Sequence, residues 1–195
     1  MNRADVCSDE ESALRVIAGE AKGRPLLSVP GQTTRPIADR VKTALFDILG
    51  ARVEGSRFLD LFGGTGSVGI EALSRGAAEA VFVERSAAAL RVLGENLRRT
   101  GLAARAHVVR GDAFAYLSRP GIGSFDFIYI APPQYQGLWA RALRDIDKRP
   151  DLLTAQGLAI AQIFPKEFAE LALAHLRLSD RRFYGSTLLV FYSFG

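Results

Sequence analysis

The chain has 195 residues, a length that suits one domain with at most a small appendage. With 48% hydrophobic and 24% charged residues, its composition excludes a fibrous or wholly disordered protein. The single cysteine, Cys7, excludes an intrachain disulfide framework and a cysteine-based zinc cluster, and with two histidines no metal site is expected. No apolar run approaches the ~20 residues of a membrane span and the polar start lacks a signal-peptide core, so we expect a cytoplasmic protein; nothing demands more than a monomer.

The net charge of +4 is concentrated near the N-terminus. Between residues 12 and 45 there are six bases and two acids, whereas the rest of the chain sums to zero. A basic segment on a neutral body is typical of a phosphate-binding surface, although it also fits an ordinary solvated face. The bases of this segment are Arg15, Lys22, Arg24, Arg35, Arg40 and Lys42.

The N-terminal quarter of the chain shows three kinds of pattern. Residues 1–12 are polar and acidic and predict a disordered head. Short apolar runs at 14–18 and 25–29, joined by a glycine-rich turn, predict a β-hairpin. A helical period follows at 38–49. The predicted organisation is therefore a head (1–12), a basic N-terminal hairpin and helix (13–50) and a main domain (51–195).

The main domain alternates strand-like and helical patterns. Repeated strand–helix units predict a mostly parallel, doubly wound sheet that is covered by helices on both faces. Two final β-rich runs at 175–184 and 187–194 flank Gly185-Ser186 and predict an antiparallel hairpin. The other predicted strands are 57–62, 79–83, 106–110, 125–131 and 157–163, and the predicted helices are 67–75, 86–99, 112–118, 136–147 and 165–174.

A glycine-rich loop follows the first of these strands. Gly64, Gly66 and Gly69 form the spacing G-x-G-x-x-G between a predicted strand and a predicted helix. Glu84 lies 20 residues after Gly64, at the end of the next strand. Such glycines allow a tight turn and a close approach of a ligand, and the acid can bind ribose hydroxyls. The arrangement indicates a nucleotide-binding site.

Asp60 distinguishes between two nucleotide cofactors. It ends the strand immediately before the loop, where its carboxylate would repel the pyrophosphate of NAD and attract the ammonium and sulfonium of S-adenosylmethionine. The pattern favours S-adenosylmethionine and makes an NAD-dependent dehydrogenase a distant alternative. Asp112 follows the next strand but one, where it can accept from the adenine amino group, cap a helix, or do both.

Four segments of the chain carry a resemblance to a known family. They are RVIAGEAKGRPL (Arg15–Leu26), TRPIADRVKTALFDILG (Thr34–Gly50), FLDLFGGTGSVGIEALSRGA (Phe58–Ala77) and FVERSAAALRVLGENL (Phe82–Leu97). With them the chain resembles the bacterial methyltransferases that modify the exocyclic N2 of one guanine in small-subunit ribosomal RNA. The first two segments are specific to this family, and the other two are shared with class I methyltransferases in general. The resemblance covers nearly the whole chain from Arg15 onward.

The resemblance implies a Rossmann-like class I methyltransferase: a seven-stranded, mostly parallel sheet with an antiparallel last strand. It implies that Asp60, Gly64 and Gly66 line the methionine end of the cofactor, with Glu84 at the ribose and Asp112 near the adenine. Their neighbours Phe62, Gly63, Arg85 and Ala113 join this predicted cofactor site. The hairpin and residues 34–40 are implied to contact RNA, through Arg15, Lys22, Arg24, Arg35 and Arg40.

The chain departs from the family at one motif. The family has Asp-Pro-Pro-Tyr after its fourth strand, whereas this chain has Ala131-Pro132-Pro133-Gln134-Tyr135. The prolines can still direct the carbonyl of Pro132 at the target amino group. The acceptor acid is absent, and the stacking aromatic is displaced by one residue to Tyr135. Gln134 and, at a greater distance, Gln162 offer side-chain carbonyls in its place.

We therefore predict catalytic roles for Pro132, Pro133, Gln134 and Tyr135 in methylation of a guanine N2, with ribosomal RNA or the small ribosomal subunit as the partner. The altered motif keeps two alternatives open. One is a methyltransferase for another nucleic-acid amino group, on DNA or on another RNA base. The other is a catalytically impaired RNA-binding or ribosome-assembly factor that retains the cofactor fold.

Overall fold

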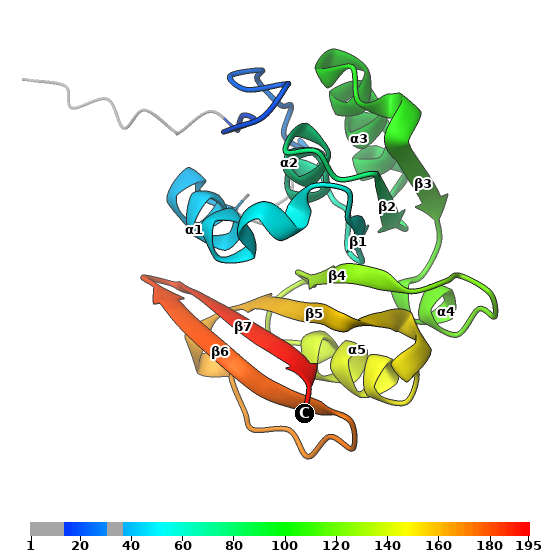
Figure 1. The fold of residues 1–195 in the computed structure, drawn as a ribbon. Coiled ribbons are helices and arrows are strands. Elements are labelled where there is room, and N and C mark those ends of the chain that lie inside the picture. Colours follow the sequence, from blue (N-terminus) through cyan, green and yellow to red (C-terminus); the bar gives the residue numbers. More distant parts are fainter. Residues whose placement is uncertain (1–13, 31–36) are drawn as a thin grey trace, which may run out of the picture.

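The computed structural model describes residues 14–30 and 37–195 (Figure 1). The predicted head and the candidate RNA contact Arg35 lie outside the described residues. The remaining chain forms one seven-stranded sheet with helices packed on both faces.

The strand order in this sheet is β3-β2-β1-β4-β5-β7-β6. Neighbours from β3 through β5 pair in parallel, and β7 runs antiparallel to both β5 and β6. The predicted mostly parallel sheet with an antiparallel last strand is confirmed. The strands are β1 (Arg57–Asp60), β2 (Glu79–Glu84), β3 (Ala106–Arg110), β4 (Phe125–Ile130), β5 (Leu153–Ile163), β6 (Leu176–Tyr184) and β7 (Thr187–Phe194).

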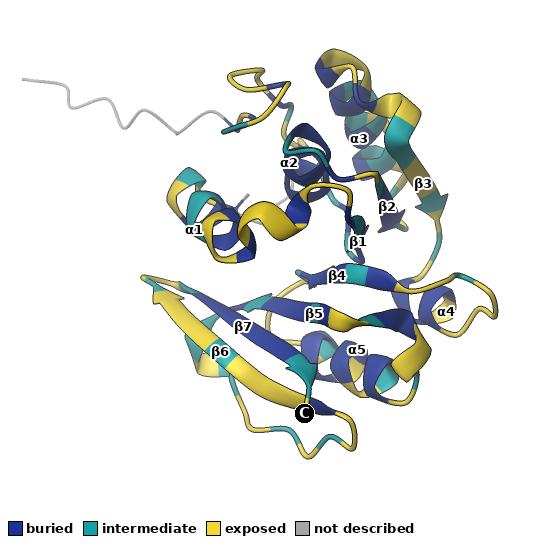
Figure 2. Ribbon diagram, viewed as in Figure 1, coloured by how far each residue is buried: buried dark blue, intermediate teal, exposed yellow. Residues whose placement is uncertain are grey.

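Two apolar clusters, one on each face, hold the helices to the sheet. Helices α1 (Asp39–Leu49), α2 (Ser67–Ser74) and α3 (Ala87–Thr100) contribute to one cluster, and α4 (Ala113–Leu117) and α5 (Leu138–Asp147) contribute to the other. Every residue of α2 is buried, as Figure 2 shows. Short 3-10 turns complete the secondary structure at Gly50–Val53, Ala103–Arg105, Pro150–Leu152 and Pro165–Glu167.

The order of the strands reverses between β1 and β4. From β1 the chain proceeds to β2 and β3 on one side, and from β4 to β5 on the other. In doubly wound sheets the loops at such a point diverge and leave a ligand crevice at the carboxyl ends of the strands. Asp60, the last residue of β1, pairs in register with Tyr129, two residues before Ala131. The predicted cofactor loop and the altered proline motif therefore meet at this crevice.

The predicted N-terminal hairpin is present only as a single antiparallel bridge between Arg15 and Pro25. A few backbone hydrogen bonds, such as Val16 N–H to the carbonyl of Arg24, surround that bridge. Regular strands do not extend because the next amide groups donate to side chains of α2 instead: Ile17 and Ala18 donate to the carboxylate of Glu71. The segment 14–30 is thus held by a helix rather than by a partner strand.

The predicted helix at 165–174 is wrong. The structure has a 3-10 turn at Pro165–Glu167, followed by chain without helix or strand up to β6. Phe168, Leu171 and Leu173 pack against the cluster on the α5 side of the sheet. Their partial burial in an irregular segment accounts for an apolar spacing that resembles a helical period.

Candidate active site

The glycine loop (residues 61–66) has a conformation that requires its glycines. Gly64 and Gly66 have φ angles of +52° and +79°, in the left-handed region. A Cβ atom on Gly66 would lie 2.2 Å from Cδ1 of Leu93, and one on Gly69 would lie 2.3 Å from Cε1 of Phe82. The glycines therefore permit both the tight turn and the close packing of α2 on β2.

Glu84 connects the end of β2 to the glycine loop. Its Oε2 accepts a hydrogen bond of 2.9 Å from the amide of Gly64. Its Oε1 accepts from the amides of Arg85 and Ser86, at 2.8 and 2.7 Å. Each carboxylate oxygen offers two lone pairs, so Oε2 keeps one acceptor position beyond these bonds. Glu84 can hold the loop and still accept from a ligand hydroxyl.

Asp60 is a buried acid at the base of the glycine loop. The residue is 3% exposed, and its Oδ2 accepts from the amide of Gly69 at 3.3 Å. Burial, the largest cause, and the nearby charge of Glu84 together raise the pKa of Asp60 from 3.8 to about 7, although the hydrogen bond from Gly69 acts in the opposite direction. A cationic ligand beside this carboxylate would favour its ionised form.

Asp112 caps helix α4 directly after β3, on the same side of the crevice as β1 and β2. Its Oδ1 accepts from the amides of both Phe114 and Ala115 at 3.0 Å. The rings of Phe114 and Phe62 meet edge-on, with their centroids 6.2 Å apart. Cζ of the Arg141 guanidinium lies 3.7 Å from the centroid of the Phe114 ring. The carboxylate of Asp112 therefore lies near the rings of Phe114 and Phe62, and the buried Ala113 follows it in the chain.

The proline motif (residues 131–135) leaves the carboxyl end of β4. Ala131 packs against the apolar cluster on the α1 face, and Pro132 is half-buried. Pro133, Gln134 and Tyr135 are exposed. Gln162 is the more distant candidate acceptor. Its side-chain oxygen accepts a hydrogen bond from the hydroxyl of Tyr129.

A residue that the sequence analysis missed holds this motif. Oε1 of Glu167 accepts a 2.6 Å hydrogen bond from the amide of Tyr135. The predicted helix at 165–174 contains Glu167, and the sequence pattern assigns this residue no role in the site. The signal that could have found it is its place just after β5, because parallel neighbours β4 and β5 end at the same edge of the sheet.

The basic N-terminal residues differ in what they contact. Nε of Arg15 pairs with Asp39 at 2.9 Å, and Nη1 of Arg24 donates to the carbonyl of Arg99 at 3.0 Å. Lys22 and Arg40 are exposed. Lys42, the sixth base of this segment, is fully buried and is therefore not part of a surface footprint.

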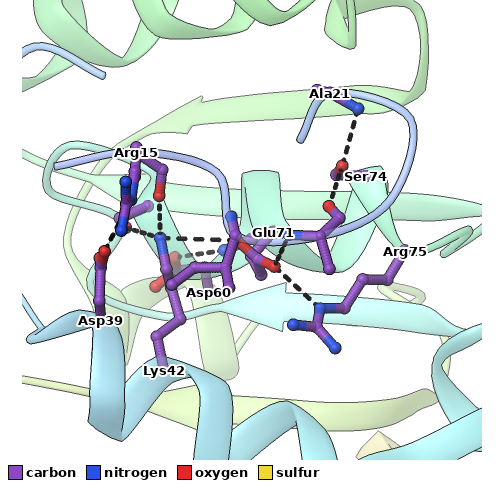
Figure 3. Close-up of polar contacts among 12 residues, drawn as sticks. Arg15, Ala21, Asp39, Lys42, Asp60, Glu71, Ser74 and Arg75 are labelled. Atoms are coloured by element: carbon purple, nitrogen blue, oxygen red, sulfur yellow. Dashed lines mark hydrogen bonds and ion pairs between the residues drawn. The ribbon is translucent and has the colours of Figure 1, made fainter. Parts of the chain in front are cut away.

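Two buried side chains fasten the N-terminal segment (residues 14–30) to the glycine loop and α2. The ammonium of Lys42 donates to the carbonyl of Arg15 (Figure 3). It also donates to Oγ of Ser67, the first residue of α2. The amide of Asn96 bonds both backbone groups of Leu27 and the carbonyl of Thr65 in the loop. The same two buried side chains, Lys42 and Asn96, therefore bind both the N-terminal segment and either the glycine loop or the start of α2.

Comparison with known proteins identifies the family. A family model described as "Conserved hypothetical protein 95" matches residues 14–193. The chain belongs to this family. Its curated relatives include the "Putative rRNA methyltransferase YlbH" of Bacillus subtilis, 34% identical over 92% of this chain and 98% of that protein. The "Ribosomal RNA small subunit methyltransferase D" of Escherichia coli is 36% identical over 64% of this chain and 62% of that protein.

Solved structures show that the family fold extends over the described chain. The "Putative methyltransferase yhhF" of Escherichia coli has a TM-score of 0.82 and 28% identity, covering 93% of this chain and 98% of that one. A hypothetical protein of Thermus thermophilus has a TM-score of 0.74 and 34% identity, covering 93% and 99%. The fold is thus a Rossmann-like methyltransferase fold. None of the described helices is long and apolar enough to cross a membrane.

Proposed function

We propose that this chain transfers a methyl group from S-adenosyl-L-methionine to the exocyclic N2 of a guanine in small-subunit ribosomal RNA. The observation that carries the proposal is the junction of β1 and β4, where buried Asp60 lies in register next to the strand that leads into the proline motif. The names of the curated relatives support ribosomal RNA as the substrate class.

The residues around the glycine loop fit the cofactor. The left-handed Gly64 and Gly66 leave backbone accessible for close approach, and the buried carboxylate of Asp60 suits a cationic ligand. The remaining acceptor position of Glu84 suits a ribose hydroxyl, and Asp112 beside Phe114 suits an adenine. When bound, S-adenosylmethionine supplies an electrophilic methyl group on a positively charged sulfur.

The proline motif orients the target. The N2 lone pair of guanine is delocalised into the ring, so an acceptor must fix the amino group for attack. The carbonyl of Pro132 is the acceptor that we assign, with the rigid Pro133 and the side chain of Gln134 beside it. Tyr135 stacks on the extruded base. The exposure of Gln134 and Tyr135 supports this assignment because both side chains are accessible to an RNA substrate.

Ala131 limits the rate of this reaction. A hydrogen bond to a charged acceptor contributes about 1.5–3 kcal/mol, so its loss corresponds to a roughly 10–100-fold slower step. The alanine also favours a second candidate function, an RNA-binding or ribosome-assembly factor that binds cofactor without turnover. The two functions differ in whether methyl groups reach the RNA.

A methyl-transfer assay tests the proposal. Labelled S-adenosylmethionine is supplied with small ribosomal subunits from cells that lack this protein, and the product is digested to nucleosides. Labelled N2-methylguanosine is expected from the wild type and none from D60N. A different methylated nucleoside would change the target, and cofactor binding without incorporation would favour the assembly factor.

A further inference from the structure

The ends of β4 and β5 are joined by one acid. The two strands are parallel neighbours, with Ile130 opposite Ala161, so the segments that follow them leave the sheet side by side. Glu167 belongs to the segment after β5. Its Oε1 accepts from the amide of Tyr135 at 2.6 Å, and its Oε2 accepts from the amide of Phe164 at 3.2 Å. One carboxylate therefore fixes both segments.

Tyr135 has a backbone that requires such support. Its φ angle is +59°, and among the described residues no other non-glycine residue has a positive φ. A side chain in the left-handed region is strained and persists where the surroundings hold it. The hydrogen bond from its amide to Oε1 of Glu167 holds the backbone at this residue.

The strained conformation presents an aromatic surface. Tyr135 is 67% exposed, and its ring centroid lies 5.7 Å from that of Phe164 at an interplanar angle of 47°. Phe164 thus packs beside the tyrosine ring, while most of the Tyr135 surface stays accessible to a ligand. Aromatic rings that stand free beside a substrate pocket are suited to stacking on an unpaired base.

We propose that Glu167 is a positioning residue that holds Tyr135 in its left-handed conformation, so that Tyr135 and Phe164 form a stacking platform for the target base beside Pro132. The identity of the ligand as a base depends on the proposed function. The hydrogen bond between the Glu167 carboxylate and the Tyr135 amide, which we call the clamp, does not depend on the proposed function. The clamp and the platform can therefore be tested separately.

Amide hydrogen exchange measured by NMR tests the clamp without any substrate. The Tyr135 amide of the wild type is expected to exchange at least about 10-fold more slowly than that of E167A, because an exposed amide is protected only by its hydrogen bond. E167Q retains an acceptor oxygen and is expected to restore part of the protection. The matched control is E170A, which removes an exposed glutamate three residues along the same segment. Equal exchange in the wild type and E167A would overturn the clamp.

Intrinsic fluorescence verifies the fold of each variant. The chain has one tryptophan, Trp139, which is buried and stacked on Phe168 at 6.3 Å. It reports the packing between the start of α5 and the segment that carries Glu167. Emission of E167A that matches the wild type excludes a general loss of structure as the reason for faster exchange.

Methyl-transfer kinetics on small ribosomal subunits test the platform. Removing the stacking ring is expected to lower kcat roughly 5–100-fold, while RNA affinity changes little because remote contacts retain the substrate. Y135L and E167A should lose similar amounts, Y135F should keep the rate, and the double variant E167A/Y135L should lose no more than Y135L alone. Additive losses, or an E167A variant with the wild-type kcat, would overturn the platform. A wild type without transfer would overturn the proposed function, and the exchange result would still decide the clamp.

Discussion

The ammonium of Lys42 lies 3.1 Å from the hydroxyl of Ser67, the residue with which α2 begins. The same ammonium lies 2.5 Å from the carbonyl of Arg15 and 3.5 Å from a carboxylate oxygen of Glu71, and both charged side chains are fully buried. Burial lowers the pKa of Lys42, and the charge of Glu71 opposes that shift. Lys42 thus links α1, the N-terminal segment and the helix that follows the glycine loop.

Replacement of this buried lysine should destabilise the protein. In K42M the carboxylate of Glu71 loses a buried partner, although Arg75 and two backbone amides still contact it. Removing one member of a buried pair typically costs about 3–5 kcal/mol. We expect a loss near the lower value in urea unfolding, because Glu71 keeps these contacts.

The matched control for K42M is K148M. Lys148 pairs with Asp145 at 3.5 Å, but its side chain is 73% exposed, so its replacement should change the unfolding free energy by less than about 1 kcal/mol. Equal urea midpoints for K42M and K148M would contradict the role assigned to the buried network.

The raised pKa of Asp60 predicts how stability depends on pH. In the folded protein this group titrates at about 7, whereas its ordinary value is 3.8. Between these values the folded state binds more protons than the unfolded state, so the ligand-free protein loses stability as pH rises from about 4 to about 7. The full effect is about 4 kcal/mol by linkage. D60N should flatten this part of the stability profile, and an unchanged profile would contradict the buried, protonated carboxylate.

Cofactor binding should be linked to the same proton. A bound cation favours ionised Asp60, so S-adenosylmethionine should release a proton at or below neutral pH and bind more tightly as pH rises toward 7. Calorimetric titrations at pH 6.5 in two buffers of different ionisation enthalpy would measure this release. Binding heats that do not depend on the buffer would show that the cation does not contact Asp60.

The sequence patterns that were interpreted correctly are those set by local physical requirements. A strand covered on both faces must be apolar, and the run from Phe125 to Ile130 showed this plainly. The turn after β1 needs residues with left-handed backbone angles, and the glycines supply them. The position of Glu84 could be predicted because it ends the apolar run that forms β2. Such requirements are visible without knowledge of the tertiary structure.

The features that were missed depend on contacts between distant segments. The hairpin does not extend because Glu71, more than 50 residues away, accepts from the amides of Ile17 and Ala18. Lys42 contributed to a basic stretch in the sequence but is completely buried against that same acid. Glu167 acquires its contact with Tyr135 only because β4 and β5 are neighbours in the sheet.

Restoring the absent acid should accelerate methyl transfer. Ala131 is half-buried where the family motif has aspartate. A131D would return a charged acceptor beside the Pro132 carbonyl, and we expect kcat to rise roughly 10-fold. A131N provides a neutral acceptor of the same size and is the matched control. If A131D is no faster than A131N, the missing charge does not limit the reaction.

The exposed bases of the N-terminal region should determine how RNA binding depends on salt. Each phosphate contact that is removed should reduce the slope of log K against log salt by about 1. K22A and R40A, which remove exposed bases, are expected to show this change. R15A should change the slope less, because Asp39 already pairs with Arg15. Titration of a labelled ribosomal RNA fragment across a salt series measures each slope, with K148A, at the end of α5, as the control. Slopes of K22A and R40A equal to that of K148A would place the RNA on another surface.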